Sequence, residues 1–334
     1  MKKAVTLIDI AKACNTSNVT VSKALADKSG VSDELREKIK QVAEEMGYVP
    51  SKTVTSKKKS NIGVLIPARY IGVNGSFYWT LYNCLAQRLK REGLYCVIEN
   101  LDLKDEENLI MPNVVTDRNI NVMISLGEIS HPYAHRLAES VEHLILLDYY
   151  VPGLKVDSIV TNGYNGGYKL ASYLISLGHE RIGFIGSKMA TSSIFDRYMG
   201  YLKALIEHGL PIREDWVVAD RDEKQSPIEL CFPEEMPTAF VCNCDETAFL
   251  TIKQLREKGY SVPEDISIVG YDNYLISEVS DPTITTISVD AEYMAELTVN
   301  TLIQRINDPA TIYRMRTIEG ELIIKNSVLP LKRV

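Results

Sequence analysis

Residues 6–25 read TLIDIAKACNTSNVTVSKAL, and this stretch predicts two short helices joined by a tight turn. Thr6 is a candidate N-cap, and apolar residues follow it at helical spacing until the polar break at residues 15–17. Asn15 suits a tight turn because asparagine tolerates the left-handed backbone conformation better than most residues do. Ser17 can cap the second helix. The stretch therefore predicts a helix-turn-helix.

A third helix is expected to begin after Ser32, its candidate N-cap. Acidic residues occupy the first turn, and apolar residues recur at helical spacing before the terminator Gly47. In the second helix Val21 should face the bundle, and the outward-facing residues are Asn18, Val19, Ser22 and Lys23. A plain three-helix bundle with a solvated second helix also fits this pattern.

Charge is divided unevenly along the 334-residue chain. Residues 1–60 contain 12 basic and 7 acidic residues, a balance of +5, whereas the remainder contains 25 and 37, a balance of −12. No acidic residue lies between Asp9 and Asp27, so the second helix can approach DNA without like-charge repulsion. Its hydroxyl groups can donate to phosphates, and Lys23 can reach a guanine or a phosphate. The two parts of the chain are predicted to have different functions.

Four segments of the first fifty residues carry a family resemblance. In chain order they are VTLIDIA (5–11), TVSKAL (20–25), VS (31–32) and GYVP (47–50). Together they resemble the headpiece of the lac repressor/gal repressor family of bacterial transcription regulators, which bind double-stranded operator DNA. The resemblance implies that the residues reading base edges are Asn18, Val19 and Lys23. It implies phosphate contacts from Thr6, Ser17, Thr20 and Ser22.

Residues 51–61 form the expected hinge or linker after a headpiece of residues 1–50. In the family that the chain resembles, a hinge helix here presents a leucine that wedges into the minor groove and kinks the DNA. This segment has no leucine, Lys57 stands at the wedge position, and the threonines and valine have poor helix propensity. We expect its lysines to bind phosphates electrostatically, without strong kinking of the DNA.

From residue 61 onward, short β-branched runs alternate with helical stretches. The runs cover residues 62–68, 95–100, 122–127, 144–148, 182–187, 239–243 and 266–272. This alternation predicts parallel sheets with helices on both faces. The region is long for one sheet, and residues 157–167 indicate a strand and a Gly-rich turn where a second unit begins. We predict an α/β core of two doubly wound parallel-sheet lobes, with a cleft beyond the carboxyl ends of the strands.

The same family resemblance extends over this core. It rests on GGY (166–168), LGHERIGFIG (177–186), RYMGY (197–201), DETA (245–248), VPEDISIVGYDN (262–273) and PTITTI (282–287). The resemblance implies a periplasmic-binding-protein-like core in which the chain crosses between lobes near residues 160, 288 and 319. The first lobe would then comprise residues 62–159 and 288–318, and the second lobe residues 160–287 and 319–334.

Several polar and aromatic residues fall where the cleft is expected. Asp272 ends a strand and can accept two sugar hydroxyls, and Arg197 can donate a planar fork to neighbouring oxygens. Both match effector-contacting positions of the family. By the same resemblance, further effector contacts are Phe77, Tyr78, Ser125 and Asp148. The alternatives are a purely structural ion pair for the first two residues and simple core packing for the two aromatic residues.

Two expected pocket positions depart from the family pattern. Cys244 stands where relatives often have an asparagine, so a hydrogen bond to the ligand is expected to be missing. Asp222 falls where relatives often offer an aromatic ring. The expected lining then has three acids, Asp148, Asp222 and Asp272, against one arginine. This balance predicts an unusual ligand that is polar or cationic.

No catalytic motif stands out in the sequence, which contains no P-loop, no nucleophile elbow and no dinucleotide-binding glycine pattern. Cys242 and Cys244 form a lone C-x-C pair, which predicts buried thiols rather than a metal site. We therefore expect neither a cofactor nor enzymatic activity. No long apolar run occurs, so we also expect no membrane span, no secretory signal and a cytoplasmic location.

The predicted function is that of an effector-controlled transcription factor, and of a repressor rather than an activator. As a homodimer the protein would place two headpieces on a pseudo-palindromic operator, while a small effector, in this family most often a carbohydrate, binds between the lobes. A solute-binding protein of a sugar transporter shares the core but has no use for a helix-turn-helix. An enzyme on the same scaffold is the third alternative.

Overall fold

The computed structural model describes residues 5–25, 30–46, 48, 61–71, 76–118 and 120–331. The chain divides into two compact units, Met1–Lys58 and Lys59–Val334. The expectations for Gly47 and for the hinge segment, with its wedge position at Lys57, lie outside the described residues.

The described residues of the first unit form three helices, α1 (Leu7–Ala13), α2 (Asn18–Leu25) and α3 (Asp33–Glu45). Its core consists of Ile10, Ala11, Cys14, Val21, Ala24, Ile39 and Ala43. Asn15 has a φ of +50°, which confirms the left-handed turn residue between α1 and α2. The predicted helix-turn-helix is thus present, with the apolar spacing of each helix directed at one small shared core.

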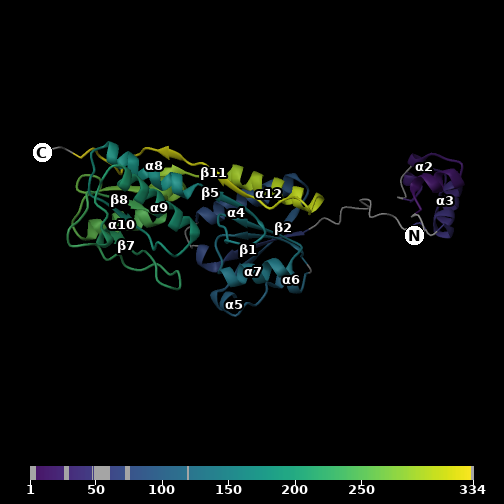
Figure 1. Cartoon of the computed structure of the whole chain (residues 1–334), viewed down its shortest axis with the longest axis horizontal. Helices are drawn as coiled ribbons and strands as arrows, with labels where there is room; N and C mark the ends of the chain where they lie inside the picture. The colour runs from purple at the N-terminus through teal and green to yellow at the C-terminus, as the bar shows by residue number, and fades with distance from the viewer. Residues whose placement is uncertain are drawn as a thin grey trace. The chain divides into compact units, whose positions relative to one another are not determined.

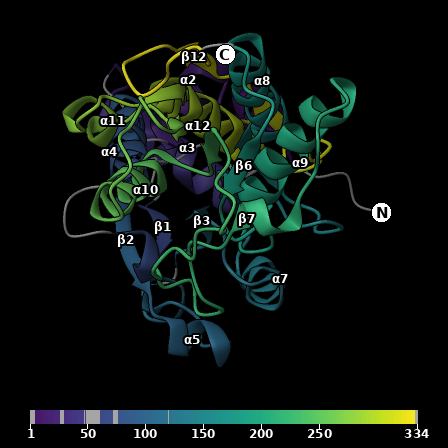
Figure 2. The same ribbon diagram turned by 90° about the vertical axis from the view of Figure 1, so that its left-hand side faces the viewer.

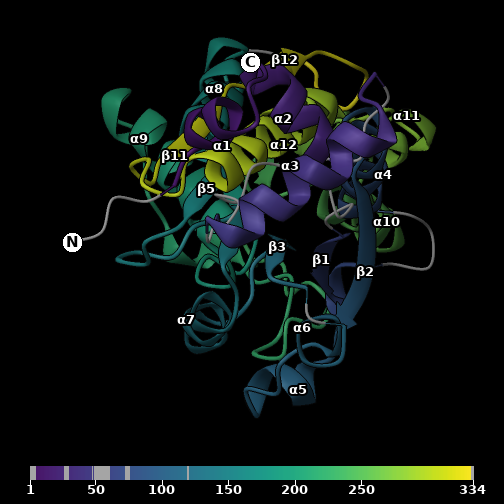
Figure 3. The same cartoon turned by 90° about the vertical axis from the view of Figure 1, so that its right-hand side faces the viewer.

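The first sheet of the second unit has six parallel strands in the order β11-β5-β4-β3-β1-β2. The strands are β1 (Asn61–Pro67), β2 (Tyr95–Leu101), β3 (Val122–Leu126), β4 (His143–Leu147), β5 (Asp157–Thr161) and β11 (Met315–Ile318). Helices α4 (Phe77–Arg91) and α12 (Ala291–Asn307) cover one face. The other face carries α6 (Asn113–Thr116) and α7 (His131–Ser140), with α5 (Leu103–Glu107) after β2. Figure 3 shows these two layers of helices on either side of β1 and β3.

The second sheet has the order β12-β10-β9-β8-β6-β7. Its strands are β6 (Ile182–Ile185), β7 (Val217–Val218), β8 (Ala239–Cys242), β9 (Ser267–Asp272), β10 (Thr285–Ser288) and the antiparallel edge strand β12 (Glu321–Ile323). One face is covered by α8 (Gly163–Ser176) and α9 (Ser192–Glu207). The other carries α10 (Asp245–Glu257), and α11 (Leu275–Val279) follows β9. Figure 2 shows α8 and α9 to one side of β6 and α10 to the other.

The two sheets are the centres of two lobes, which lie side by side within the second unit (Figure 1). The chain passes from the first sheet to the second after β5, returns after β10 through α12, and passes over again after β11. Four strands were not predicted, namely β7, β10, β11 and β12. Strands β10 and β11 have four residues each, as the predicted β6 and β8 do, but they mix polar with apolar residues and so form no apolar run. Strands β7 and β12, with two and three residues, are too short to show any pattern.

One prediction about the junction between the lobes is wrong. Residues 157–161 form a strand of the first sheet, and the glycines Gly166 and Gly167 lie inside α8 rather than in a turn. Gly167 lies in α8 where this helix packs closely on α9. A Cβ at this position would stand 2.0 Å from the carbonyl oxygen of Arg197. Glycine is therefore needed here for a close approach of two backbones and not for a left-handed conformation.

Within the described residues, no helix combines the length and the apolar character that crossing a membrane requires.

Candidate ligand pocket and nucleic-acid interface

Helix α2 turns one face to its bundle and the other to solvent. Val21 and Ala24 are fully buried against α1 and α3, whereas Val19 is 64% exposed. Three polar side chains share the exposed face with Val19, namely Asn18, Ser22 and Lys23. This face, which we call the α2 outer face, contains the side chains expected to read base edges.

Hydroxyl groups at the helix starts are partly engaged within the headpiece. The Asp9 carboxylate accepts hydrogen bonds from the backbone N–H of Thr6 at 2.9 Å and from its hydroxyl at 2.7 Å. The Ser17 hydroxyl accepts from the N–H of Thr20 at 3.1 Å and lies 2.9 Å from the Thr20 hydroxyl. These bonds fix the starts of α1 and α2.

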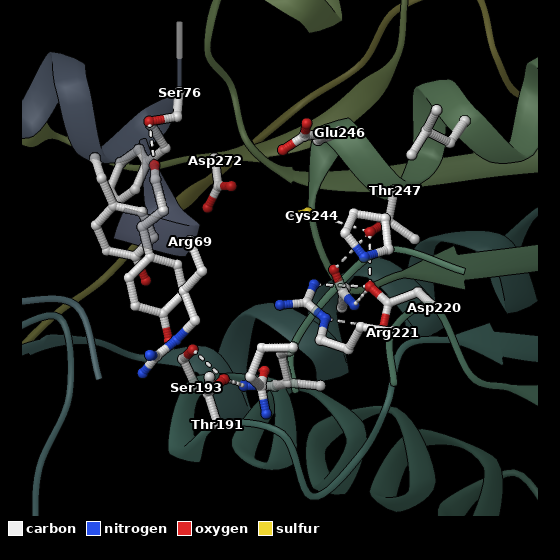
Figure 4. Close-up of a pocket in the computed structure, with 18 of the residues that line it drawn as sticks. Arg69, Ser76, Thr191, Ser193, Asp220, Arg221, Cys244, Glu246, Thr247 and Asp272 are labelled. Carbon is white, nitrogen blue, oxygen red and sulfur yellow. Dashed lines mark hydrogen bonds and ion pairs between the residues drawn. The ribbon is translucent and has the colours of Figure 1, made fainter. Parts of the chain in front are cut away.

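A cavity of about 270 Å³ lies between the two lobes, at the carboxyl ends of their parallel strands. The first lobe contributes the segment after β1, the start of α4 and the end of β4. The second lobe contributes the start of α9, the segment after β7, the start of α10 and the end of β9. Figure 4 shows Arg69 on one side of the cavity, with Arg221 and Asp220 on the other. The fold thus brings together residues that are up to about two hundred positions apart.

Aromatic rings form the wall on the first-lobe side. The rings of Tyr70 and Tyr78 are stacked with centroids 4.6 Å apart, and Phe77 meets Tyr78 edge-on at 5.7 Å. Phe77 also belongs to the core of the first lobe, so it has a packing role in addition to lining the cavity. We call these three side chains the aromatic wall.

Asp148 stands next to the aromatic wall, at the end of β4. Its Oδ2 accepts a hydrogen bond from the Tyr78 hydroxyl at 3.0 Å, whereas its Oδ1 is buried without a hydrogen-bond partner among the described residues. Burial raises the pKa of Asp148 to about 6, against the lowering effect of Arg197. The residue also has a φ of +69°, a strained conformation for a residue with a side chain. An open, buried acceptor of this kind is suited to bind a ligand.

Arg197 and Asp272 form a buried ion pair on the second-lobe side. Arg197 comes from α9, and its Nη2 lies 3.6 Å from Oδ1 of Asp272 while its Nη1 donates to the carbonyl of Asn243 at 2.6 Å. The guanidinium carbon also lies 3.8 Å from the ring centroid of Tyr271. Burial raises the pKa of Asp272 well above its ordinary value, although Arg197 opposes this. The pair is structural and also lines the cavity, so the two interpretations of these residues are compatible.

Sequence reasoning missed the most connected side chain of the cavity, Asp220. Its carboxylate accepts from Arg221 at 2.7 and 3.1 Å, from Asn243 at 2.6 Å, from Thr247 at 3.0 Å and from the N–H of Ser187 at 2.8 Å. Burial alone would raise the pKa of Asp220, but these hydrogen bonds and the charge of Arg221 hold it at about 2. The available signal was the position after β7, a strand too short to be recognised.

Two expected residues lie outside the cavity lining. Ser125 is fully buried and accepts a hydrogen bond from the Tyr149 hydroxyl at 2.7 Å. Asp222 is exposed and accepts from the backbone N–H groups of Lys224 and Ser226, both at 2.9 Å, within its own turn. The expected count of three acids to one arginine was therefore wrong. The other expected effector contacts do line the cavity: Phe77, Tyr78, Asp148, Arg197, Cys244 and Asp272.

Cys244 precedes α10 and lines the cavity as a thiol. Its Sγ lies 3.4 Å from the Thr247 hydroxyl, and burial raises the pKa of the thiol to about 12. Within the described residues, no group of three His, Cys, Asp or Glu side chains is placed to hold a metal ion. Cys244 stands where an asparagine was expected, and the residue before it, Asn243, has an amide side chain. The amide of Asn243 donates to Asp220 at 2.6 Å.

Direct hydrogen bonds join the lobes beside the cavity. The Glu128 carboxylate of the first lobe accepts from the backbone N–H and the hydroxyl of Ser192, both at 2.7 Å, at the start of α9. The Tyr150 hydroxyl reaches Asp196 at 3.4 Å. A carboxylate at a helix start also interacts favourably with the helix dipole. We call these two contacts the lobe clasp.

A helix-turn-helix unit, followed by a two-lobed core with a cavity at the strand ends, defines a ligand-responsive DNA-binding regulator. Two family models match the chain: residues 6–51 match the bacterial regulatory proteins of the lacI family, and residues 171–328 match a periplasmic binding protein-like domain. The chain belongs to the lacI family of bacterial regulatory proteins. It is a DNA-binding transcriptional repressor of a family without enzymatic activity, and a transporter's solute-binding protein is not favoured.

Relatives match over nearly the whole chain. The HTH-type transcriptional repressor PurR of Actinobacillus pleuropneumoniae is 28% identical, with 98% of this chain and 99% of the relative covered. The ribose operon repressor of Haemophilus influenzae gives the same identity and coverage. Among solved structures, a lac repressor dimer bound to operator and the anti-inducer ONPF superposes with a TM-score of 0.69 at 21% identity, covering 98% of this chain and 100% of that one. These structures share the fold.

Proposed function

We propose that this protein represses transcription as a homodimer on a pseudo-palindromic operator, and that a carbohydrate bound in the cavity controls the repression. The observation that carries the effector half is the cavity itself, which faces a stacked aromatic wall with buried carboxylates and guanidinium groups. Aromatic faces pack against the apolar faces of sugar rings, while carboxylate and arginine side chains bind hydroxyl groups in pairs. Cytoplasmic action follows from the need to reach operator DNA.

The α2 outer face is the proposed base-reading surface. Asn18 and Lys23 present hydrogen-bonding groups and Val19 an apolar surface, a combination that reads base edges in a major groove. Phosphate contacts are assigned to hydroxyl groups around the helix starts, namely those of Thr6, Ser17, Thr20 and Ser22. Two copies related by symmetry would place two such helices in successive major grooves.

The effector contacts are assigned to the cavity-lining set Phe77, Tyr78, Asp148, Arg197, Cys244 and Asp272. Among relatives and structural neighbours, one is named a ribose operon repressor and another is a CelR complex with cellobiose. These names support a carbohydrate without specifying which one. Ser125 is assigned an indirect role, because its contact is with the buried Tyr149.

Control by the ligand requires different affinities for two lobe arrangements, since a ligand that binds both equally shifts nothing. The lobe clasp is an element that differs between such arrangements, because the contacts of Ser192 with Glu128 exist only while the lobes stand close. A ligand bound to both walls of the cavity would favour the clasped arrangement. The difference in ligand-binding free energy between the two arrangements would set how strongly the ligand changes operator affinity.

The DNA half is tested by selecting an operator from a random pseudo-palindromic duplex library and measuring its affinity by fluorescence anisotropy over a range of salt concentrations. Affinity should fall steeply with salt as counterions are released. Lys23→Ala should weaken specific binding by about 1–3 kcal/mol. The charge-matched control is Lys38→Ala on α3. Equal losses in the two variants, or affinity independent of salt, would contradict this assignment.

The effector half is tested by thermal-shift screening of the full chain against neutral mono- and disaccharides, followed by operator binding in the presence of each hit. A sugar that binds only the native state raises the melting midpoint by mass action. Asp272→Asn should abolish the shift, and Asp222→Asn, close in sequence but outside the cavity, should preserve it. A shift that survives Asp272→Asn unchanged would place the sugar elsewhere.

A further inference from the structure

The cavity between the lobes contains more negative than positive side chains. Four acids line it, namely Asp148, Asp220, Glu246 and Asp272, against three arginines, Arg69, Arg197 and Arg221. Glu106, which lies outside the lining, binds Arg69 at 2.5 and 3.3 Å and so adds a fifth acid to the same group. With every group ionised, the balance is two negative charges.

Two of the three arginines are already neutralised. Arg69 is held by Glu106 and also donates to the carbonyl of Glu128 at 2.7 Å. Arg221 makes a two-pronged contact with Asp220 at 2.7 and 3.1 Å. Only Arg197 is left to compensate the other acids, and its nearest carboxylate contact is the 3.6 Å pair with Asp272. The arginines therefore leave little attraction for an anionic ligand.

The remaining carboxylates have open acceptor atoms. Asp148 is 3% exposed, and its Oδ1 has no hydrogen-bond partner among the described residues. Asp272 is 7% exposed, and among the described residues its carboxylate is paired with Arg197 alone, at 3.6 Å. Glu246 is exposed at the edge of the cavity and points toward the same space as Asp272 (Figure 4). A buried carboxylate is costly unless a hydrogen-bond donor or a cation satisfies it.

The aromatic wall adds a second attraction for positive charge. Tyr78 donates to Asp148, and the rings of Tyr70 and Phe77 pack against Tyr78. The face of Tyr70 already has the Arg69 guanidinium at 5.0 Å from its centroid. Aromatic faces attract cations through their quadrupole, and more strongly when water is excluded. Aromatic rings and open carboxylates in one cavity are a combination that recognises an ammonium group.

We propose that the effector of this cavity carries a protonated amine, as an amino sugar does, and that anionic sugars such as sugar phosphates are rejected. This inference rests on the proposed carbohydrate effector and specifies its charge. The ammonium group would donate to Asp148 and Asp272, which lie on opposite lobes, so the same contact would hold the lobes together. The ring of the sugar would lie against the aromatic wall.

Binding of an amine should change the titration of Asp148. Burial raises the pKa of its carboxyl to about 6. The charged groups near it are Arg197, Glu128 and Asp272, and Tyr78 is its hydrogen-bond donor. A bound ammonium group would lower this pKa, so the protein would release protons on binding near neutral pH. Affinity for the amine should rise as the pH increases from about 5 to 7, because more of the carboxyl is then ionised. A neutral sugar, which offers hydroxyl donors without a positive charge, would cause a smaller release.

The experiment is calorimetric titration of the full chain with matched probes that share one ring. Glucosamine, glucose and glucose 6-phosphate form one set, galactosamine and galactose a second, mannosamine and mannose a third, and the open-chain amine glucamine is included with sorbitol. Each titration is repeated in two buffers of different ionisation enthalpy. Glu246→Gln tests the carboxylate at the cavity edge, and Glu257→Gln, on the same helix but outside the cavity, is its matched control.

The expected result is an amine that binds about tenfold or more tightly than its hydroxyl counterpart, with proton release, and a preference that Glu246→Gln reduces. Binding of neutral sugars as tight as that of amines, or of the phosphate, overturns the charge assignment and leaves the carbohydrate effector standing. Binding of glucamine without any ring sugar supports the amine and overturns the carbohydrate ring. No binding by any probe overturns both.

Discussion

The α2 outer face and the cavity between the lobes hold their polar groups in opposite ways. On α2, Asn18, Ser22 and Lys23 are exposed and come from a single helical turn and a half. In the cavity, Asp220 is buried and binds the adjacent Arg221 as well as groups from two other segments of the chain, at Ser187 and at residues 243–247. The first surface can lose a side chain without consequence for the fold, whereas the second is part of the folded core.

The difference predicts that the two proposed functions will respond differently to mutation. An exposed side chain reads DNA through its own donor and acceptor groups, so its loss costs affinity and little else. A buried ionic group supports its neighbours, so its loss costs stability and ligand binding together. We therefore expect substitutions in the cavity to change stability and ligand affinity together, and substitutions on the α2 outer face to change DNA affinity alone.

The largest effect is expected from Asp220→Ala. The change removes the carboxylate that accepts from Arg221, Asn243 and Thr247, and takes from a largely buried guanidinium its ion-pair partner. Urea unfolding of the full chain should show that the core loses about 3–5 kcal/mol. Asp222→Ala, which removes two bonds of an exposed turn, should cost about 1 kcal/mol or less. Equal losses would contradict the role given to Asp220.

The next effect concerns pH. Burial raises the folded pKa of Asp148 from 3.8 to about 6, so the unfolded chain ionises first as the pH rises. Its contribution to stability is therefore complete below about pH 4 and is lost by about pH 7, an effect of about 3 kcal/mol on the free energy of unfolding. Asp148→Asn should remove this contribution. The measurement is the difference in unfolding free energy between wild type and variant across that range, and a constant difference would contradict the prediction.

A smaller loss is expected from Gly167→Ala. The added Cβ would meet the backbone carbonyl of Arg197, so α8 and α9 must separate, at a cost of about 1–3 kcal/mol. Because Arg197 moves with α9, affinity for the effector should fall while operator affinity without effector stays unchanged. Ser172→Ala, in the same helix and adding no atom, is the control. Unchanged thermal stability and ligand affinity in the glycine variant would refute the close-packing argument.

The smallest effect is expected at a helix start of the headpiece. Ser17→Ala removes the acceptor for the N–H of Thr20 and should destabilise α2 by about 1 kcal/mol. Hydrogen exchange of α2 amides in the full chain should accelerate about fivefold, the equivalent of that free energy. Ser22→Ala, in the middle of the same helix, should leave exchange unchanged. Faster exchange in both variants alike would remove the capping role.

Much of the fold could be predicted because its signals are local. The helix-turn-helix follows from apolar spacing over twenty residues, from Ser17 as a cap and from Asn15 in the turn, all of which interact within a few positions. The strands that were predicted are apolar runs, and such runs can be recognised in the sequence alone. The short strands β7, β10, β11 and β12 have no such signal, because hydrogen bonding to longer neighbours makes them strands.

The sequence by itself determined the outward face of α2, because helical geometry places Asn18, Val19, Ser22 and Lys23 on one side whatever surrounds them. It also indicated that Arg197 and Asp272 lie at a cleft. Only the tertiary structure decided that Asp220 rather than Asp222 lines the cavity and that Glu106 neutralises Arg69. Those facts depend on which side chains from distant segments meet, and burial there sets both the hydrogen bonds and the charge that a ligand encounters.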